Sequence, residues 1–287
     1  MKKKNIPTVI LIVVFAVGLC VFLYPTVSNL LSRFRQTRVI EDYDAAVAAL
    51  DTTDMDRMLD EARAYNEQYA KNAFSYREDV ENGTELYRNT LNIRNGVMGR
   101  LKIDKLDVNL PIYHGTSASV LQSGIGHLPM TSLPVGGEGT HAVLSGHRGL
   151  PSAELLSKLD RMENGDIFYI YILNEVLAYE VKEIRTVLPS ELDSLSIDPH
   201  ADKVSLVTCT PYGINTHRLI VTGYRIPYED TIVEQYRAGA DALLISPRAV
   251  AFYVGVPVFL LVILIILLRY RRKSKKRKGV KSDENTE

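Results

Sequence analysis

Two long apolar runs, one near each end of the chain, set the strongest limit on how this sequence folds. They cover residues 6–24 and 249–268, and neither contains a charged side chain. A helix of about 20 residues crosses roughly 30 Å of hydrocarbon, so each run is long enough to span a bilayer. We therefore predict a transmembrane helix at each end, with the folded region of the chain between them.

Basic residues lie on the outer side of both runs, in residues 1–5 and 269–287. By the positive-inside rule both termini are cytoplasmic, and the region between the runs is extracellular. A cleaved signal peptide is the alternative for the first run, although no clear small-x-small cleavage site follows it. The basic clusters adjoin apolar runs and do not alternate with aromatic residues, so we do not expect nucleic-acid binding.

The extracellular region has two textures. Residues 25–95 are highly charged, with apolar residues at helical spacing, and we predict a helical extension of two helices outside the main core. Residues 229–248 are predicted to form a connecting helix that leads to the second membrane run.

Residues 96–228 alternate short β-rich runs with Gly, Pro and Asn, which is typical of a β-sandwich or β-barrel. The expected fold class is therefore mainly β. We predict strands at residues 97–103, 108–113, 140–145, 166–173, 176–188, 204–208 and 219–224, and a short helix at residues 152–159.

The residues most suited to chemistry lie between positions 203 and 225. Their pattern predicts a buried strand that ends at Cys209, a turn-rich loop, and a second strand that begins beside Arg218. Two strands joined in this way bring Cys209 and Arg218 to neighbouring strand ends. A thiol that faces a fixed cation is suited to attack on a carbonyl, with the cation stabilising the oxyanion.

Cysteine usage supports a reactive thiol and argues against a metal site. The other cysteine, Cys20, lies inside the first apolar run, so Cys209 is a lone thiol in a compartment that permits disulfides. A small buried hydrophobe is the alternative interpretation of Cys209. With one cysteine outside the membrane no zinc motif is available, and the acidic residues form no calcium loop. We expect no cofactor and no metal.

These residues resemble the sortases, the membrane-bound cysteine transpeptidases of Gram-positive bacteria. The family signature is Thr-Leu-x-Thr-Cys with an arginine about nine residues later, and here residues 205–209 are Ser-Leu-Val-Thr-Cys with Arg218 at that spacing. The catalytic histidine of the family matches His147 in Leu-Ser-Gly-His-Arg. Residues 136–141 and 210–218 are similar to those of class C sortases, the pilus-building group.

The resemblance implies an eight-stranded β-barrel over residues 96–228 and assigns three catalytic roles. Cys209 would be the nucleophile, His147 the general acid and base, and Arg218 the stabiliser of the oxyanion or the substrate backbone.

The resemblance also suggests residues that contact the substrate. Thr208 and Ser145 would bind its backbone, and His127 would either be structural or line the substrate groove. Class C sortases usually carry a lid built on Asp-Pro-aromatic, which this chain lacks in the corresponding region. Phe74 or Tyr76, within residues 72–79, is the candidate lid aromatic.

The implied reaction cleaves a Leu-Pro-x-Thr-Gly-type sorting motif on a pilin or other surface protein. An acceptor lysine of another pilin would then resolve the acyl-enzyme and form an isopeptide bond. Three alternatives remain open from the sequence. They are a cell-wall-anchoring sortase that uses a peptidoglycan amine, a simple cysteine protease, and a non-catalytic membrane-tethered module that binds sorting motifs.

Overall fold

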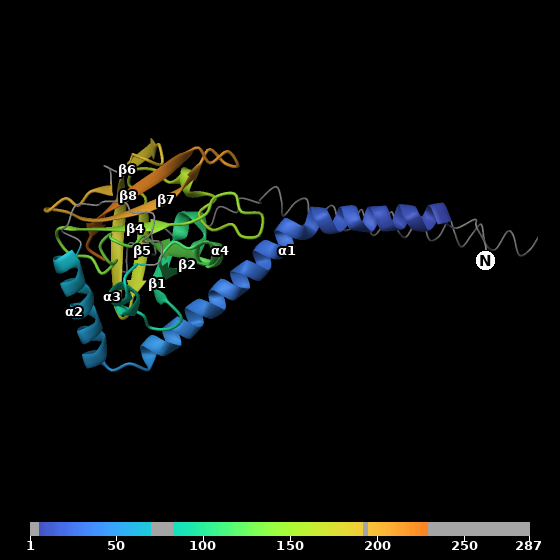
Figure 1. Cartoon of the computed structure of the whole chain (residues 1–287). Helices are drawn as coiled ribbons and strands as arrows, with labels where there is room; N and C mark the ends of the chain where they lie inside the picture. The colour runs from blue at the N-terminus through green and yellow to red at the C-terminus, as the bar shows by residue number, and fades with distance from the viewer. Residues whose placement is uncertain (1–5, 70–82, 192–194, 229–287) are drawn as a thin grey trace, which may run out of the picture. The chain divides into compact units, whose positions relative to one another are not determined.

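The computed structural model describes residues 6–69, 83–191 and 195–228, and eight strands in it form a closed barrel (Figure 1). The order around the barrel is β1-β2-β3-β4-β7-β8-β6-β5, and β5 pairs back with β1. This confirms the expected eight-stranded barrel. The strands are β1 (Val97–Ile103), β2 (Val108–His114), β3 (Ile125–His127), β4 (Thr140–Ser145), β5 (Ile167–Ile172), β6 (Glu175–Val187), β7 (Asp202–Thr210) and β8 (His217–Ile226).

The strand directions bring three strand ends to one rim of the barrel. β4 and β7 run parallel, with Ser145 opposite Val207, so both strands end at the same edge. β8 runs antiparallel to β7 and therefore begins at that edge. Residues that follow β4 and β7 therefore lie near the residues that begin β8.

Apolar side chains on the inward face of the strands fill the barrel, because successive side chains of a strand point to opposite faces of the sheet. Leu101, Ile112, Leu144, Leu206 and Val221 are completely buried. Phe168 on β5 and Tyr179 on β6 stack with their ring centroids 5.6 Å apart. The core therefore draws on strands from all around the barrel.

The N-terminal extension contains α1 (Ile6–Ala48), α2 (Thr52–Tyr69) and α3 (Glu85–Asn89) (Figure 1). The expectation that the two longer helices lie outside the main core is wrong. Tyr43 and Val47 on α1, and Leu59 and Ala62 on α2, belong to the same buried apolar cluster as the barrel interior. An apolar helical stripe has to cover another apolar surface, and here that surface is the barrel wall.

Buried hydrogen bonds fix these helices in one orientation. The hydroxyl of Tyr43 donates to the carbonyl of Met98 at 3.2 Å and accepts from the amide of Leu173 at 2.9 Å. The side chain of Asn66 bonds both the carbonyl and the amide of Leu133, at 3.0 and 2.7 Å. Because these backbone groups would otherwise be buried without partners, the bonds select one docking geometry.

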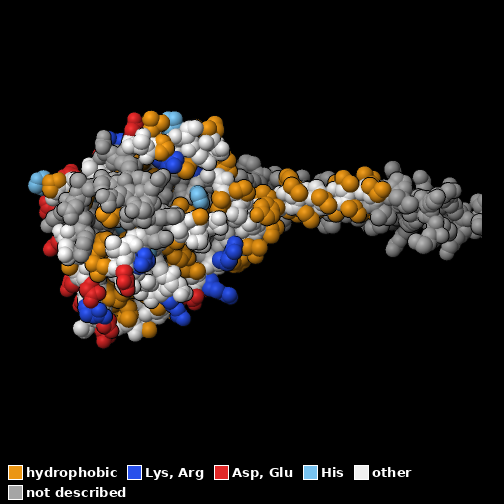
Figure 2. Space-filling view, in the orientation of Figure 1, with side chains coloured by type: hydrophobic (Ala, Val, Ile, Leu, Met, Phe, Trp, Pro, Cys, Tyr) orange, Lys and Arg blue, Asp and Glu red, His pale blue; other side chains and the backbone are white. Residues whose placement is uncertain are grey.

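Among the described residues, one helix is long and apolar enough to cross a membrane, and it is α1. The apolar side chains of this helix between Ile10 and Phe34 are largely exposed, as Figure 2 shows. The other predicted parts of the membrane topology fall outside the described residues. They are residues 1–5, the connecting helix at 229–248, the second span at 249–268 and the tail at 269–287.

The predicted helix at residues 152–159 is wrong. The chain makes turns there, and a single 3-10 turn, η4 (Leu159–Arg161), follows. Leu155 has a φ of 38°, a left-handed conformation that ends any α-helix, and its side chain is buried. Packing of the apolar side chains into the barrel therefore overrides their helical spacing. The remaining short elements are η3 (Asp104–Leu106) and α4 (Ala118–Ser123).

Candidate active site

Cys209 and Arg218 are direct partners in the antiparallel pairing of β7 and β8. Residues directly opposite each other in such a pair project their side chains from the same face of the sheet. Cys209 is partly buried. The Arg218 Nη1 donates to the carbonyls of Asn215 and His217, at 3.3 and 3.2 Å. The sequence prediction that Cys209 and Arg218 meet at neighbouring strand ends is therefore confirmed.

A tight turn sets the positions of both strand ends. The amides of Ile214 and Asn215 donate to the carbonyl of Pro211, at 3.1 and 3.0 Å. Asn215 closes the turn with a φ of 63°, a conformation that asparagine adopts more readily than most residues. The turn joins β7 to β8 in the register that puts Arg218 beside the thiol.

His147 follows β4 at the same rim. The parallel register pairs Ser145 with Val207, and one residue later the amide of Gly146 donates to the carbonyl of Val207 at 3.0 Å. Continued by two residues, this register aligns His147 with Cys209. His147 and Cys209 thus each follow a paired strand position by two residues, and Arg218 is paired directly with Cys209.

Burial sets the protonation of the imidazole. His147 is partly buried, and loss of hydration lowers its pKa below the usual value. The neutral ring is therefore the main form at neutral pH. A neutral imidazole beside a thiol accepts its proton, and the imidazolium so formed returns a proton to a leaving amine.

Comparison with known proteins identifies this arrangement. The sortase domain profile matches residues 101–226. The crystal structure of sortase C1 from Streptococcus agalactiae aligns with a TM-score of 0.62 at 45% sequence identity, covering 67% of this chain and 100% of that chain. The chain belongs to the sortase family.

Two further relatives show how far the likeness extends. The sortase C structure from Streptococcus pneumoniae has a TM-score of 0.61 and 43% identity, covering 67% of this chain and 97% of that one. The curated sortase A of Streptococcus agalactiae is 30% identical over 44% of this chain and 51% of its own length. The chain thus spans about half the length of that curated sortase. The extension formed by α1 and α2 lies outside the matched sortase domain.

Packing requires a glycine at position 146 of this sortase. A Cβ placed there would lie 2.8 Å from the Cδ1 atoms of both Ile125 and Leu156. Both of these side chains are fully buried. The glycine therefore lets the chain pass over the core directly before His147.

Thr208 and Ser145 both adjoin Gly146 at the rim: Ser145 precedes it in the chain, and Thr208 contacts it from β7. The hydroxyl of Thr208 donates to the carbonyl of Gly146 at 2.7 Å, and the side chain is buried. This bond ties β7 to the residue before His147. Ser145 is the last residue of β4 and is partly buried between Gly126 of β3 and Val207 of β7.

His127 is completely buried on β3, which favours the structural one of its two expected roles. Its Nδ1 accepts from the hydroxyl of Tyr87 at 2.8 Å, and its Nε2 donates to the carbonyl of Ser132 at 2.8 Å. Burial lowers the pKa of His127 to about 3. The ring is neutral and links α3 to the barrel.

Ser205, where the family signature has threonine, belongs to a second buried network. The Oγ of Ser205 lies 2.8 Å from the Nε2 of His141 and 2.7 Å from the Oγ1 of Thr222. The other ring nitrogen of His141 donates to the carbonyl of Ser196 at 3.0 Å. The hydroxyl that serine and threonine share is what this network needs.

Arg148 is a site residue that the sequence reasoning missed. Its Nη1 donates to the hydroxyl of Thr210 at 2.9 Å, and its Nη2 pairs with Asp160 at 2.6 Å. The side chain is only 9% exposed. Arg148 follows His147 in the chain and Thr210 follows Cys209, so this hydrogen bond links the neighbours of His147 and Cys209. The position of Arg148 directly after His147 in the sequence is the signal that could have indicated it.

The candidate lid, with Phe74 and Tyr76, lies in a part of the chain that the structure does not describe. Among the described residues, no group of three or more His, Cys, Asp or Glu is arranged to hold a metal ion. A polar pocket lined by Arg63, Gly137 and Asp202 lies at the opposite rim, where β7 begins, and is therefore remote from Cys209.

Proposed function

We propose that this sortase is a class C transpeptidase that joins pilin subunits through an acyl-enzyme on Cys209. The observation that carries the proposal is the direct pairing of Cys209 with Arg218 at the rim where β4, two residues before His147, also ends. A nucleophile, a proton carrier and a fixed cation are the three groups that acyl transfer from a peptide requires.

In the first half-reaction the Cys209 sulfur attacks the threonine carbonyl of a Leu-Pro-x-Thr-Gly-type motif, after His147 has taken the thiol proton. The carbonyl oxygen becomes an oxyanion that Arg218 stabilises. The carbon–nitrogen bond to glycine then breaks, and the imidazolium of His147 gives its proton to the departing amine. The products are a thioester on Cys209 and a free glycyl amine.

In the second half-reaction an acceptor lysine amine attacks the thioester. His147 takes a proton from that amine, and the carbon–sulfur bond breaks to release the thiolate. The new bond is an isopeptide between the threonine of one pilin and the lysine of another. Protonation of the thiolate by the imidazolium of His147 restores the starting state.

Two observations favour pilin as the substrate. Several similar solved structures are class C sortases at 40–45% identity, and one of them was described with respect to pilin substrate specificity. An anchor helix supports the membrane location. We propose that both predicted spans anchor the protein, with both termini in the cytoplasm and the barrel outside.

The test is intact-mass analysis of the full chain in detergent after incubation with a sorting-motif peptide. We expect an adduct equal to the Leu-Pro-x-Thr fragment on wild-type protein and none on the Cys209→Ala variant. Addition of a pilin that carries an acceptor lysine should then remove the adduct and yield a crosslinked product. Absence of any adduct with several sorting motifs would overturn the proposal.

The cell-wall-anchoring sortase is the second candidate, because a curated relative of this chain is a sortase A. A competition experiment, in which a pilin lysine and a peptidoglycan stem peptide are supplied together, distinguishes the two candidates. Preference for the stem-peptide amine would favour cell-wall anchoring. Release of free acid despite abundant amine would indicate a protease. A Cys209→Ala variant that still supports pilus assembly in cells would indicate a binding module.

A further inference from the structure

The loop after His147 folds back onto that residue. The amide of Leu156 donates to the carbonyl of His147 at 3.2 Å, and the amide of Gly149 donates to the Oγ of Ser157 at 3.1 Å. Leu156 is also fully buried below Gly146. Because residues 149–158 contain no regular helix, contacts of this kind decide where the loop and the backbone of His147 lie.

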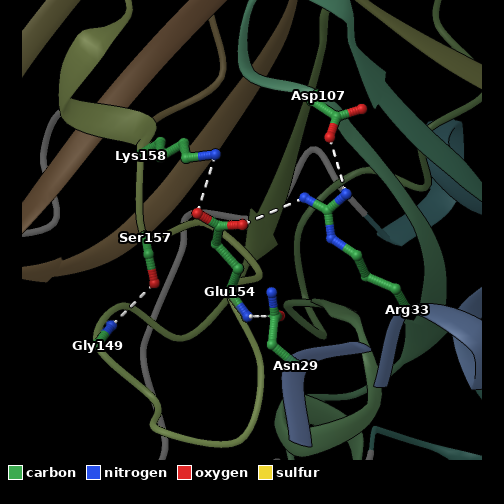
Figure 3. Close-up of polar contacts among 7 residues, drawn as sticks. All are labelled: Asn29, Arg33, Asp107, Gly149, Glu154, Ser157 and Lys158. Atoms are coloured by element: carbon green, nitrogen blue, oxygen red, sulfur yellow. Dashed lines mark hydrogen bonds and ion pairs between the residues drawn. The ribbon is translucent and has the colours of Figure 1, made fainter. Parts of the chain in front are cut away.

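The outer side of the same loop is held by α1 (Figure 3). The Oδ1 of Asn29 accepts from the amide of Glu154 at 2.8 Å. One residue earlier on α1, the hydroxyl of Ser28 donates to the carbonyl of Ser152 at 3.3 Å. The helix therefore satisfies backbone groups of a loop more than 120 positions away in the chain.

Charged groups complete the contact. Arg33 pairs through Nη2 with Glu154 at 3.2 Å and through Nη1 with Asp107 at 2.8 Å, and Lys158 pairs with Glu154 at 2.9 Å (Figure 3). Burial alone would raise the pKa of Glu154, but Lys158 and Arg33 together outweigh burial and hold the pKa below its usual value. Glu154 is therefore ionised at neutral pH.

The backbone bond to Asn29 matters more than the ion pair of Arg33. The Arg33 side chain is 44% exposed, and ion pairs in that setting contribute little because water and salt screen them. The amide of Glu154 is partly buried in the contact, and loss of its acceptor leaves a donor without a partner. Asn29 is accordingly the residue to change.

We infer that Asn29 of α1 is a positioning residue for His147, so that the membrane anchor itself helps to assemble the proposed catalytic site. This inference rests on the proposed function of His147 and Cys209. Asn29 lies five residues beyond Tyr24, the end of the apolar run, which is about 8 Å along a helix. The anchor and the histidine loop thus meet within two turns of the predicted membrane boundary.

The experiment uses the full chain in detergent, with Cys20→Ser in every protein so that Cys209 is the single thiol. Asn29→Ala removes the acceptor, and Asn29→Asp keeps an acceptor oxygen at the same position. Arg35→Ala is the matched control, because Arg35 is an exposed α1 residue with no ion pair among the described residues. The readouts are kcat and KM for a sorting peptide, the rate of Cys209 alkylation by iodoacetamide, and hydrogen exchange in residues 147–158.

We expect Asn29→Ala to lower kcat and the alkylation rate by ~10-fold, with KM changed less than about twofold, because misplaced catalytic groups slow chemistry more than binding. Exchange in residues 147–158 should rise. Asn29→Asp should recover most of both rates, and Arg35→Ala should match wild type. A thermal melt shows whether the variants remain folded.

Two results would overturn the inference. One is unchanged exchange in residues 147–158, which would mean that α1 does not hold the loop. The other is faster exchange with unchanged alkylation and kcat, which would mean that the loop does not position His147. Slower alkylation in a protein that cleaves no sorting peptide would instead overturn the proposed function and leave the inference standing.

Discussion

Cys209 on β7 and Arg218 on β8 face each other as a direct cross-strand pair. The pairing on either side of them is regular, from Lys203 with Tyr224 to Thr210 with His217. A slip of one residue would turn Arg218 to the other face of the sheet and bring His217 or Leu219 opposite Cys209. The barrel thus fixes the cation at the thiol through backbone pairing and the short turn, without a carboxylate partner for Arg218 among the described residues.

Removal of the Arg218 guanidinium should slow acylation far more than it weakens binding. If Arg218 stabilises the oxyanion, Arg218→Ala should lower kcat by ~10²–10³-fold, the usual cost of one lost oxyanion donor. Arg218→Lys keeps the charge but loses the planar fork of donors, and should fall between wild type and alanine. Single-turnover formation of the thioester on Cys209 measures the effect. An acylation rate within threefold of wild type for Arg218→Ala would exclude this role.

The buried hydroxyl of Thr208 should contribute to both stability and rate. Thr208→Val keeps the shape of the side chain but leaves the carbonyl of Gly146 without its donor, which costs about 1–3 kcal/mol. Because Gly146 precedes His147, kcat should fall as well. Thr208→Ser retains the hydroxyl and is the control. Urea unfolding and peptide kinetics on the three proteins provide the measurement, and equal stability of the Val and Ser variants would contradict it.

The proximity of Cys209 and Arg218 could be predicted from the sequence because its determinants are local. Cys209 and Arg218 are separated by one tight turn, so strand pattern and loop length together indicate their proximity. Seven of the strands follow from short β-rich runs that lie between Gly, Pro and Asn residues. β3 was missed because it has only three residues, Ile125 to His127, with glycine in the middle, too few to show a period.

Long-range packing accounts for what the sequence could not indicate. Helical spacing shows which face of α1 and α2 is apolar, but it does not name the barrel as the surface they cover. The same limit applies to residues 152–159, where buried Leu155 adopts a left-handed conformation. The contact of Asn29 with Glu154 joins positions 125 residues apart, and no local pattern encodes it.

Acid should destabilise this protein through two buried histidines. Burial lowers the pKa of His127 to about 3 and that of His141 to about 4, whereas both titrate near 6.5 when unfolded. Above pH 6.5 neither state binds a proton, so the stability is fully present. Below pH 6.5 these two histidines bind protons in the unfolded chain but stay neutral in the folded chain, so the free energy of unfolding falls. Between pH 7 and 5 each histidine should remove about 2 kcal/mol.

The measurement is guanidinium unfolding of the detergent-solubilised chain at several pH values. His127→Gln removes one titrating group while keeping a side-chain donor for the carbonyl of Ser132. Whatever its stability at pH 7, this variant should lose about 2 kcal/mol less than wild type between pH 7 and 5. Identical pH dependence of the two proteins would show that His127 is not held neutral by burial.

Activity should require that the guanidinium of Arg148 contacts two partners at once. It bonds Thr210 with one nitrogen and Asp160 with the other, and so ties the neighbours of Cys209 and His147 together. A lysine ammonium is a single point charge and does not span both partners in the fixed fork geometry. We expect Arg148→Lys to lower kcat by ~10-fold while KM stays within about twofold, because the proposed nucleophile Cys209 and the proposed base His147 lose their relative placement.

Substitution of Asp160 tests whether Arg148 acts through the geometry of its contacts or through its ion pair. Asp160→Asn keeps an oxygen that accepts from the Arg148 Nη2 but removes the ion pair, and Asp160 is 48% exposed, so its charge contributes little. The Asn variant should therefore retain kcat within about threefold of wild type. If instead Asp160→Asn were as slow as Arg148→Lys, the charge at position 160 and not the bridging geometry of Arg148 would control the placement of His147 and Cys209.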